Sequence, residues 1–219
     1  MKNFFAGDLY ASDYRKAAHE MCRSQMNNLA LIYFIFVLLI GAASVIVPFV
    51  GSLVISVCSG AFIFSFISIA KNVYLGINVK VENLFDGFKE FGRAFVIYLL
   101  MEVYVLLWCL IPIVGPFIAM VKGYSYAMAP YIALDNPDMG YNDCITRSRE
   151  IMDGHKWQLF CLMFSYIGWM ILCSFTFGIL YFWVAPRMQQ AQFLFYLKIT
   201  GIGYGVEVER EKIFEGEAE

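Results

Sequence analysis

The sequence predicts an all-α fold: a polytopic membrane protein whose six transmembrane helices form three hairpins, joined by cytoplasmic amphipathic connector helices. Three observations lead to this prediction. The chain of 219 residues is 60% hydrophobic and 16% charged, whereas a soluble domain is about one-quarter charged and about half apolar. The apolar residues are concentrated in three long runs. Each run is interrupted near its middle by residues that break or turn a helix.

The three runs define the expected spans. Residues 24–70 contain no charge, residues 94–134 contain only Glu102 and Lys122, and residues 157–197 contain only Arg187. Each run is about twice the ~20 residues that cross a bilayer as a helix. Lipid offers no partner to open backbone groups, so each half should be helical. The expected spans are residues 28–47, 53–74, 94–111, 116–134, 157–175 and 179–196. The second half of the sixth, which carries Pro186 and three glutamines, could instead lie in the interface.

The positions of the basic residues predict the orientation. Apart from Lys122 and Arg187, every Lys and Arg lies in one of four segments that share one side of a six-span arrangement: residues 1–23, 71–93, 135–156 and 198–219. The positive-inside rule makes this side cytoplasmic, so both termini are expected inside. The expected division is a cytoplasmic amphipathic segment (1–27), a six-span domain (28–197) and an acidic cytoplasmic tail (198–219).

Two of the charged segments are expected to form amphipathic helices. In residues 81–93, the apolar side chains at helical spacing are Val81, Leu84, Phe85 and Phe88. In residues 141–153, one side is formed by Tyr141, Cys144, Ile145 and Met152. The polar surface of the second helix is expected to carry two i,i+4 pairs, Asp143–Arg147 and Arg149–Asp153. Asn136 and Pro137 are a start signal for this helix.

The end of the second amphipathic helix is expected to turn into the fifth span. Gly154 can adopt the left-handed conformation that ends a helix. His155 and Lys156 would then lie at headgroup level, and Trp157 would anchor the start of the span. We interpret Arg149, His155, Lys156 and Trp157 as interfacial residues, with contact to lipid phosphate as the functional alternative to a solvated position.

Two short motifs recur along the chain. VPFVG at residues 47–51 resembles IPIVG at residues 111–115, and LFDGFK at residues 84–89 resembles IMDGHK at residues 151–156. They suggest a repeated unit of amphipathic helix, outward span, turn and returning span. A chance similarity is equally open, because any hairpin turn favours proline and glycine.

Glu102, Lys122 and Arg187 are the candidate functional charges within the spans. A charge at the centre of a bilayer costs about 2.5–3.5 kcal/mol or more, so it usually finds a partner. Counting residues from the hairpin tip places Glu102 and Lys122 at similar depths on adjacent helices. They would form either a structural ion pair or, with Arg187, a buried site for an anionic ligand or a proton-coupled step.

The sequence lacks other patterns that carry chemistry. The six cysteines include no Cys-x-x-Cys pair, and no histidine spacing suits a metal. There is no serine in a nucleophile-elbow context and no basic face for nucleic acid. We therefore expect no enzymatic activity, no cofactor or metal, and no nucleic-acid partner.

Several motifs in the C-terminal third carry a family resemblance. They are YSYAMAPY, LDNP, SREIMDGHKWQLF, SYIGW, then Thr-x-Gly-Ile and Trp-x-x-Pro, all within residues 124–196. Together they resemble a family of bacterial integral membrane proteins catalogued as domain of unknown function 975. The middle of the chain matches more loosely and the N-terminus does not match clearly. Arg187 departs from the family's usual aromatic residue after that proline. The resemblance implies a multi-pass protein of a bacterial cytoplasmic membrane, and it implies no activity.

Two functions from different classes follow from these features. The first is a non-enzymatic membrane component that binds lipid, a partner membrane protein or a second copy of the chain. It is favoured by the uncharged outer turns, the interfacial helices and the lack of catalytic patterns. The alternative is a small carrier that uses Glu102, Lys122 and Arg187. A membrane-embedded enzyme would need an active site that the sequence does not display.

Overall fold

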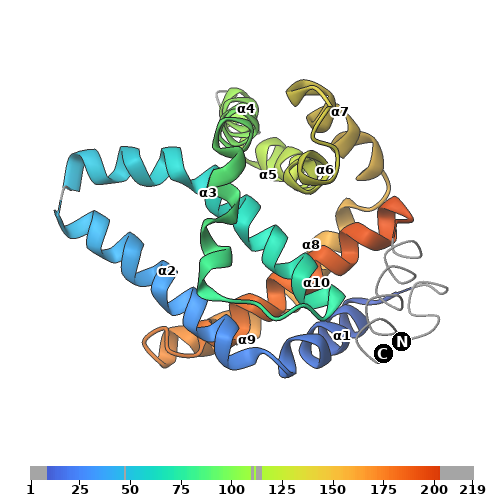
Figure 1. Ribbon diagram of the computed structural model, residues 1–219. Helices are drawn as coiled ribbons and strands as arrows, with labels where there is room; N and C mark the ends of the chain where they lie inside the picture. The colour runs from blue at the N-terminus through green and yellow to red at the C-terminus, as the bar shows by residue number, and fades with distance from the viewer. Residues whose placement is uncertain (1–8, 47, 110, 112–114, 203–219) are drawn as a thin grey trace. The chain divides into compact units, whose positions relative to one another are not determined.

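The computed structural model describes residues 9–46, 48–109, 111 and 115–202, without the side chains of residues 43–56. In this part of the chain every regular element is a helix, which confirms the predicted class (Figure 1). The helices are α1 (Ala11–Arg23), α2 (Met26–Ile46), α3 (Pro48–Leu75), the 3₁₀ helix η2 (Val81–Glu90), α4 (Phe91–Cys109), α5 (Gly115–Tyr126), α6 (Ala129–Asp135), α7 (Tyr141–Ile151), α8 (Lys156–Phe164), α9 (Ile167–Phe175) and α10 (Tyr181–Thr200). Most of the acidic tail and parts of both hairpin tips of the suggested repeat lie outside the described residues.

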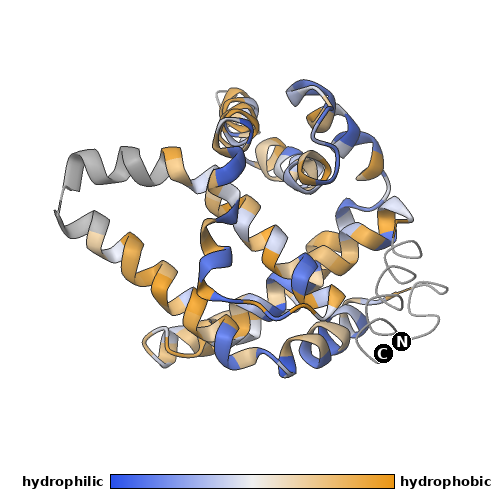
Figure 2. Cartoon of the chain, in the orientation of Figure 1, coloured by the Kyte–Doolittle hydropathy of each residue, from blue (hydrophilic) through white to orange (hydrophobic). Residues whose placement is uncertain are grey.

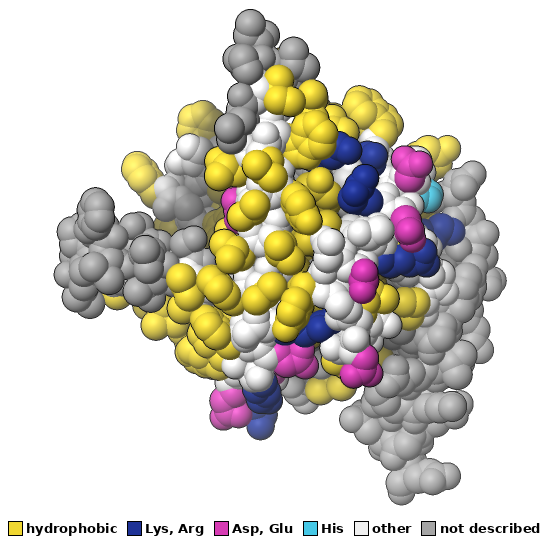
Figure 3. Space-filling model, turned by 90° about the horizontal axis from the view of Figure 1, so that it is seen from above, with side chains coloured by type: hydrophobic (Ala, Val, Ile, Leu, Met, Phe, Trp, Pro, Cys, Tyr) yellow, Lys and Arg dark blue, Asp and Glu magenta, His cyan; other side chains and the backbone are white. Residues whose placement is uncertain are grey.

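The helices differ in whether they are apolar enough to cross a membrane. Among the described residues, three stretches have the required length and composition: Val57–Leu75, Val81–Cys109 and Lys156–Phe175. A fourth span would combine α1 with α2 as far as Ala42, although this pair is bent by 96°. Figure 2 shows the contrast between the hydrophobic α2 and the largely hydrophilic α7. Figure 3 shows hydrophobic side chains over one part of a face and charged side chains gathered on another. Three or four candidate spans are thus supported, and six remains a prediction.

The predicted fourth span is not one continuous helix. It is divided into α5 and α6 by a turn at Ala127 and Met128. Pro130 lies in the first turn of α6. A proline inside a helix has no N–H to donate and clashes with the carbonyl four residues earlier. That carbonyl belongs to Tyr126, the last residue of α5, so the helix ends there.

The predicted sixth span corresponds to α10, in which 10 of the 20 residues are buried. Helix α10 begins two residues later than expected and is not among the stretches apolar enough to span. Its buried residues are Val184, Ala185, Pro186, Gln190, Ala191, Phe193, Leu194, Phe195, Tyr196 and Leu197. A helix with Arg187 and three glutamines has low overall hydropathy, and here its apolar residues pack against protein.

The chain divides into two compact units, which are described separately. In unit 1 (Met1–Ile35, Ile69–Val81 and Gln158–Glu219), α1 packs along α10. The ring of Tyr14 meets that of Phe195 edge-on at 5.8 Å between centroids. The Cys22 thiol donates to the Pro186 carbonyl at 3.8 Å. The buried residues of α1 recur at helical spacing, as expected for an amphipathic helix: Tyr14, Ala17, Ala18, Met21 and Cys22.

In unit 2 (Phe36–Ser68 and Glu82–Trp157), the first predicted connector is a 3₁₀ helix that packs on α3. Its Gly87 N–H donates to Ser65 Oγ at 2.9 Å. A 3₁₀ helix has three residues per turn, so every third residue lies on one face. Leu84 and Gly87 are therefore buried, whereas Phe85, which was expected on the apolar face, is exposed. This register differs from the α-helical one that the sequence suggested.

The second predicted connector is α7, and its buried face is largely the predicted one. Cys144 and Ile145 are buried, as is Met152 directly after the helix, but Tyr141 is exposed. Gly154 has φ of +79°, which confirms the predicted left-handed turn. Neither predicted i,i+4 pair forms; the ion pairs are Arg147–Glu150 at 3.0 Å and Lys156–Asp153 at 3.8 Å. The helix begins after Gly140, because Asn136 instead ends α6 by donating its side-chain amide to the Ile132 carbonyl.

The guanidinium of Arg93 joins α4 to the connection between α6 and α7. It donates to the carbonyls of Ala133 at 3.2 Å, Asn136 at 2.8 Å and Met139 at 2.8 Å. It also lies over the ring of Tyr141, 5.7 Å from the centroid. The last carbonyls of a helix and those of a loop lack intrahelical partners. The Asn136 carbonyl also accepts from the Met139 N–H at 3.2 Å, so Arg93 reinforces the turn after α6 as well as supplying donors to the carbonyls of Ala133 and Met139.

We predict that Gly87→Ala destabilises the protein by about 1–3 kcal/mol. An added Cβ would meet the Ala61 carbonyl and lie 2.7 Å from the Ser65 nitrogen, both of them backbone atoms of α3. The measurement is the thermal unfolding midpoint in detergent. The control is Gly92→Ala, where a Cβ would meet nothing within 4 Å and should be neutral or stabilising. Equal midpoints for the two variants would contradict the close approach of η2 to α3.

We predict that Arg93→Gln lowers the free energy of unfolding by about 2 kcal/mol, because partly buried carbonyls lose their donor. Arg147→Gln is the matched control. Arg147 pairs with Glu150 across exposed side chains, and such pairs contribute about 0–1 kcal/mol. Chemical denaturation of both variants checks the difference, and a loss confined to Arg147→Gln would refute it.

Candidate functional site

The three charges that were predicted to form one site lie on α4, α5 and α10. Glu102 is exposed on α4, and within the described residues it forms no ion pair with Lys122. The Nζ atom of Lys122 instead lies 5.0 Å from the ring centroid of Trp108. Arg187 belongs to the other unit. A shared site of these charges stays a prediction; it assumed two long antiparallel helices, whereas α5 is a helix of 12 residues.

The predicted interfacial residues have diverse surroundings. Trp157 is 71% exposed, and Lys156 pairs with Asp153 at 3.8 Å. The backbone N–H of His155 donates to the Met152 carbonyl at 3.1 Å. Arg149 is exposed on α7 and lines a cavity together with Lys122. Their contact with lipid headgroups stays a prediction.

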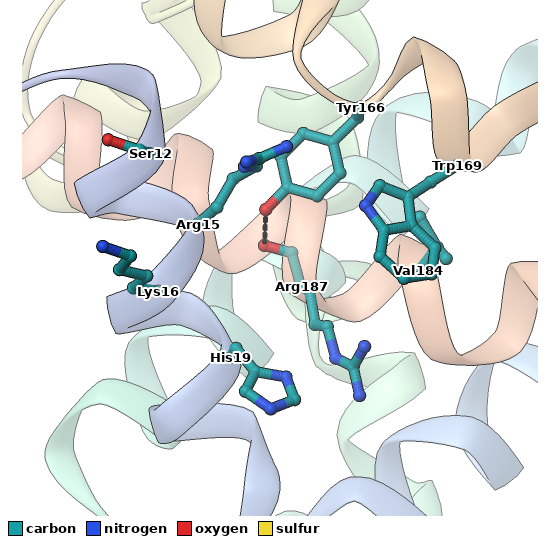
Figure 4. A pocket seen from close by; sticks show the side chains of 8 residues that line it. All are labelled: Ser12, Arg15, Lys16, His19, Tyr166, Trp169, Val184 and Arg187. Atoms are coloured by element: carbon teal, nitrogen blue, oxygen red, sulfur yellow. Dashed lines mark hydrogen bonds between the residues drawn. The ribbon is translucent and has the colours of Figure 1, made fainter.

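Arg187 lies in a basic cavity of unit 1 that the sequence analysis did not anticipate (Figure 4). The cavity has a volume of about 230 Å³. Helix α1 contributes Ser12, Arg15, Lys16 and His19, at the i, i+3, i+4 and i+7 positions that share one face. The opposite walls consist of Tyr166, Trp169, Val184 and Arg187. The described lining thus has three Lys or Arg side chains and a histidine, and no carboxylate.

The basic side chains of this cavity are held to different degrees. Arg15 donates through Nη1 to the Ser165 carbonyl at 2.9 Å, which fixes it beside the Tyr166 ring in Figure 4. The Tyr166 hydroxyl donates to the backbone carbonyl of Arg187 at 3.3 Å. The Nε–H of Arg187 is buried and has no hydrogen-bond partner within the described part of the chain. A buried donor without a partner is costly, so an acceptor at this position would stabilise the site.

The charge of Arg187 is not neutralised by the nearest thiol. Burial raises the pKa of Cys22 to about 12, and the positive charge of Arg187 lowers it only in part. Cys22 is therefore a neutral thiol at physiological pH. Neither Arg187 nor Lys16 forms an ion pair with a described carboxylate. The cavity is consequently electropositive and suited to an anion.

No group of three or more His, Cys, Asp or Glu side chains in the described part of the chain could hold a metal ion. The described lining offers donors, cations and the imidazole of His19, and it includes no carboxylate. What it can do is bind an anion between a basic helix face and an aromatic wall.

A helical projection of residues 11–23 could have revealed the face of Arg15, Lys16 and His19. This basic face lies beside the buried face of the same helix. That the face meets Arg187 depends on the packing of α1 against α10, which no local pattern encodes.

Comparison with known proteins places the chain in a family. A family model described as "Protein of unknown function (DUF975)" matches residues 10–124 and 113–202. No curated protein and no solved structure matches. The match begins at residue 10, so the resemblance also covers the N-terminal region, where the motifs gave no clear similarity. It includes α1 and α10, which form the basic cavity. The chain therefore belongs to the DUF975 family of proteins of unknown function, as the motifs of its C-terminal third indicated.

Proposed function

We propose that this protein is a non-enzymatic, multi-pass component of the bacterial cytoplasmic membrane that binds the anionic headgroup of a lipid. The observation that carries the proposal is the electropositive cavity of unit 1, lined by Arg15, Lys16, His19 and Arg187. Clusters of Lys and Arg at a membrane surface recognise anionic headgroups. Arg187 supplies a planar set of donors, and Lys16 a mobile point charge.

The placement of α1 supports binding at headgroup level. The helix is bent by 96° from the apolar α2. If α2 crosses the bilayer, α1 lies along its surface, where amphipathic helices are stable. Its buried face packs on α10 while its basic face lines the cavity. Trp169, which prefers the interface, and Val184 provide an apolar wall beside the cations.

The carrier alternative receives less support than lipid binding. It relied on an acid and two bases in one buried site. Glu102 is exposed, and the described lining of the Arg187 cavity has no carboxylate. A binding role needs only the cations that are present. Both termini inside, the six spans and a partner membrane protein remain parts of the proposal rather than findings.

Lipid retention tests this function. The full-length protein is extracted in mild detergent, and bound phospholipid is counted by native mass spectrometry. We expect Lys16→Gln and Arg187→Gln each to lower occupancy of one bound anionic phospholipid about fivefold, because each removes roughly one favourable charge contact.

Arg23→Gln is the control for these variants. Arg23 is exposed at the end of α1 and does not line the cavity. All three variants should have the unfolding midpoint of the wild type. Unchanged lipid occupancy in Lys16→Gln and Arg187→Gln would refute the proposal. A co-released protein at fixed stoichiometry, without lipid, would instead favour an accessory subunit.

A further inference from the structure

Unit 2 contains a cavity of about 430 Å³, which is larger than the basic cavity of unit 1. The sequence analysis did not predict that its lining residues lie together. It lies among α4, α5 and α7. Its cations are Lys122 from α5 and Arg149 from α7. The described lining includes no carboxylate. Lys122, which was predicted to lie within a span, and Arg149, which was predicted to be interfacial, thus line the same cavity.

Neither cation has the acidic partner that the sequence suggested. Glu102 does not line the cavity and forms no ion pair with Lys122 among the described residues. Asp153, the expected partner of Arg149, lies 3.8 Å from Lys156 instead. The ring of Trp108 attracts Lys122 at 5.0 Å. A cation–π contact lowers the cost of the charge but does not neutralise it.

Polar groups beside the two cations could complete an anion site. Thr146 and Asn142 lie one and two turns before Arg149, respectively, on the same face of α7, and both line the cavity. The Tyr104 hydroxyl donates to Asn142 Oδ1 at 2.9 Å. This contact orients the amide and leaves its NH₂ group as a donor. A tetrahedral phosphate has enough acceptor oxygens for an Arg fork, a Lys and neutral donors together, whereas a carboxylate has two.

The cavity lies where an amphipathic helix meets apolar helices. The Ser148 hydroxyl donates to the Ser125 carbonyl at 2.8 Å, which ties α7 to α5 about one turn from Lys122. Lys122 therefore reaches the level of the surface helix. The same plan occurs in unit 1, where α1 supplies the polar face, α10 supplies Arg187, and Trp169 lines the wall.

We propose that the cavity lined by Lys122, Arg149 and Asn142 is a second anion site that binds a phosphate group. The proposal is independent of the site in unit 1. A phospholipid headgroup and a soluble phosphate compound share this chemistry, so the experiment has one arm for each source.

The first arm counts phospholipids on the full-length protein after exchange into micelles that contain phosphatidylglycerol. Native mass spectrometry should show two bound phospholipids on the wild type. Lys122→Gln and Arg149→Gln should each lower the occupancy of one of them about fivefold. Arg149→Lys should retain more than Arg149→Gln. Lys16→Gln should affect only the other lipid.

The second arm measures the thermal unfolding midpoint against inorganic phosphate and glycerol phosphate in phosphate-free, neutral detergent. A rise in the midpoint that Arg149→Gln abolishes would identify a soluble phosphate as the ligand. Arg147→Gln is the control in both arms, because it removes a neighbouring charge on α7 that does not line the cavity. If both Gln variants match this control in lipid occupancy and in the response to phosphate, the second site does not exist.

The two arms separate this inference from the proposed function. Loss of lipid in Arg149→Gln but not in Lys16→Gln would support the site in unit 2 and refute the one in unit 1. The converse result in lipid occupancy, together with no response to phosphate that Arg149→Gln abolishes, would refute the inference alone. Arg149 is exposed on α7, so its replacement should leave folding intact even if Lys122→Gln does not fold.

Discussion

The cost of placing a charge on an apolar helix constrains much of this structure. A cation in such a helix must reach water, an aromatic ring or an anion. Lys122 lies against Trp108 and lines a cavity whose other cation is on α7. Arg187 is on α10, half of whose residues are buried, and it lines a cavity with the basic face of α1. In each unit an amphipathic helix therefore packs beside the cation of a more apolar helix. Helix α1 packs beside Arg187 of α10, and α7 packs beside Lys122 of α5. The two cavities follow from this placement.

The second constraint is that backbone groups next to apolar helices need partners. Arg93 supplies donors to three carbonyls, one in the last turn of α6 and two in the following loop. In unit 1, Gln25 has the same function for the segment before η2. Its amide nitrogen donates to the Ile77 carbonyl at 2.9 Å, and its oxygen accepts from the Val79 N–H at 2.7 Å. Long polar side chains thus hold connections that have no regular hydrogen bonding of their own.

Sequence patterns predicted local features better than pairings between helices. The helical class, the amphipathic α1 and α7, and the left-handed Gly154 follow from periodicity and turn chemistry. The 3₁₀ register of η2 does not follow from periodicity, because the packing of Gly87 on α3 decides which residues of η2 are buried. The interruption between α5 and α6 was readable from Pro130, but the run of apolar residues hid it. Lys122 and Arg149 were recognised as candidate residues but assigned to different groups, and their common cavity was not predicted because it depends on tertiary contacts.

The amphipathic helices separate stability from binding in a way that sequence alone did not reveal. On α1, the buried face contains Tyr14, Ala17 and Cys22, while Arg15, Lys16 and His19 line the cavity beside it. On α7, Cys144 and Ser148 are buried, while Asn142, Thr146 and Arg149 face a cavity. Packing energy comes from the first set and electrostatic potential from the second. A cavity residue can therefore change without loss of the fold.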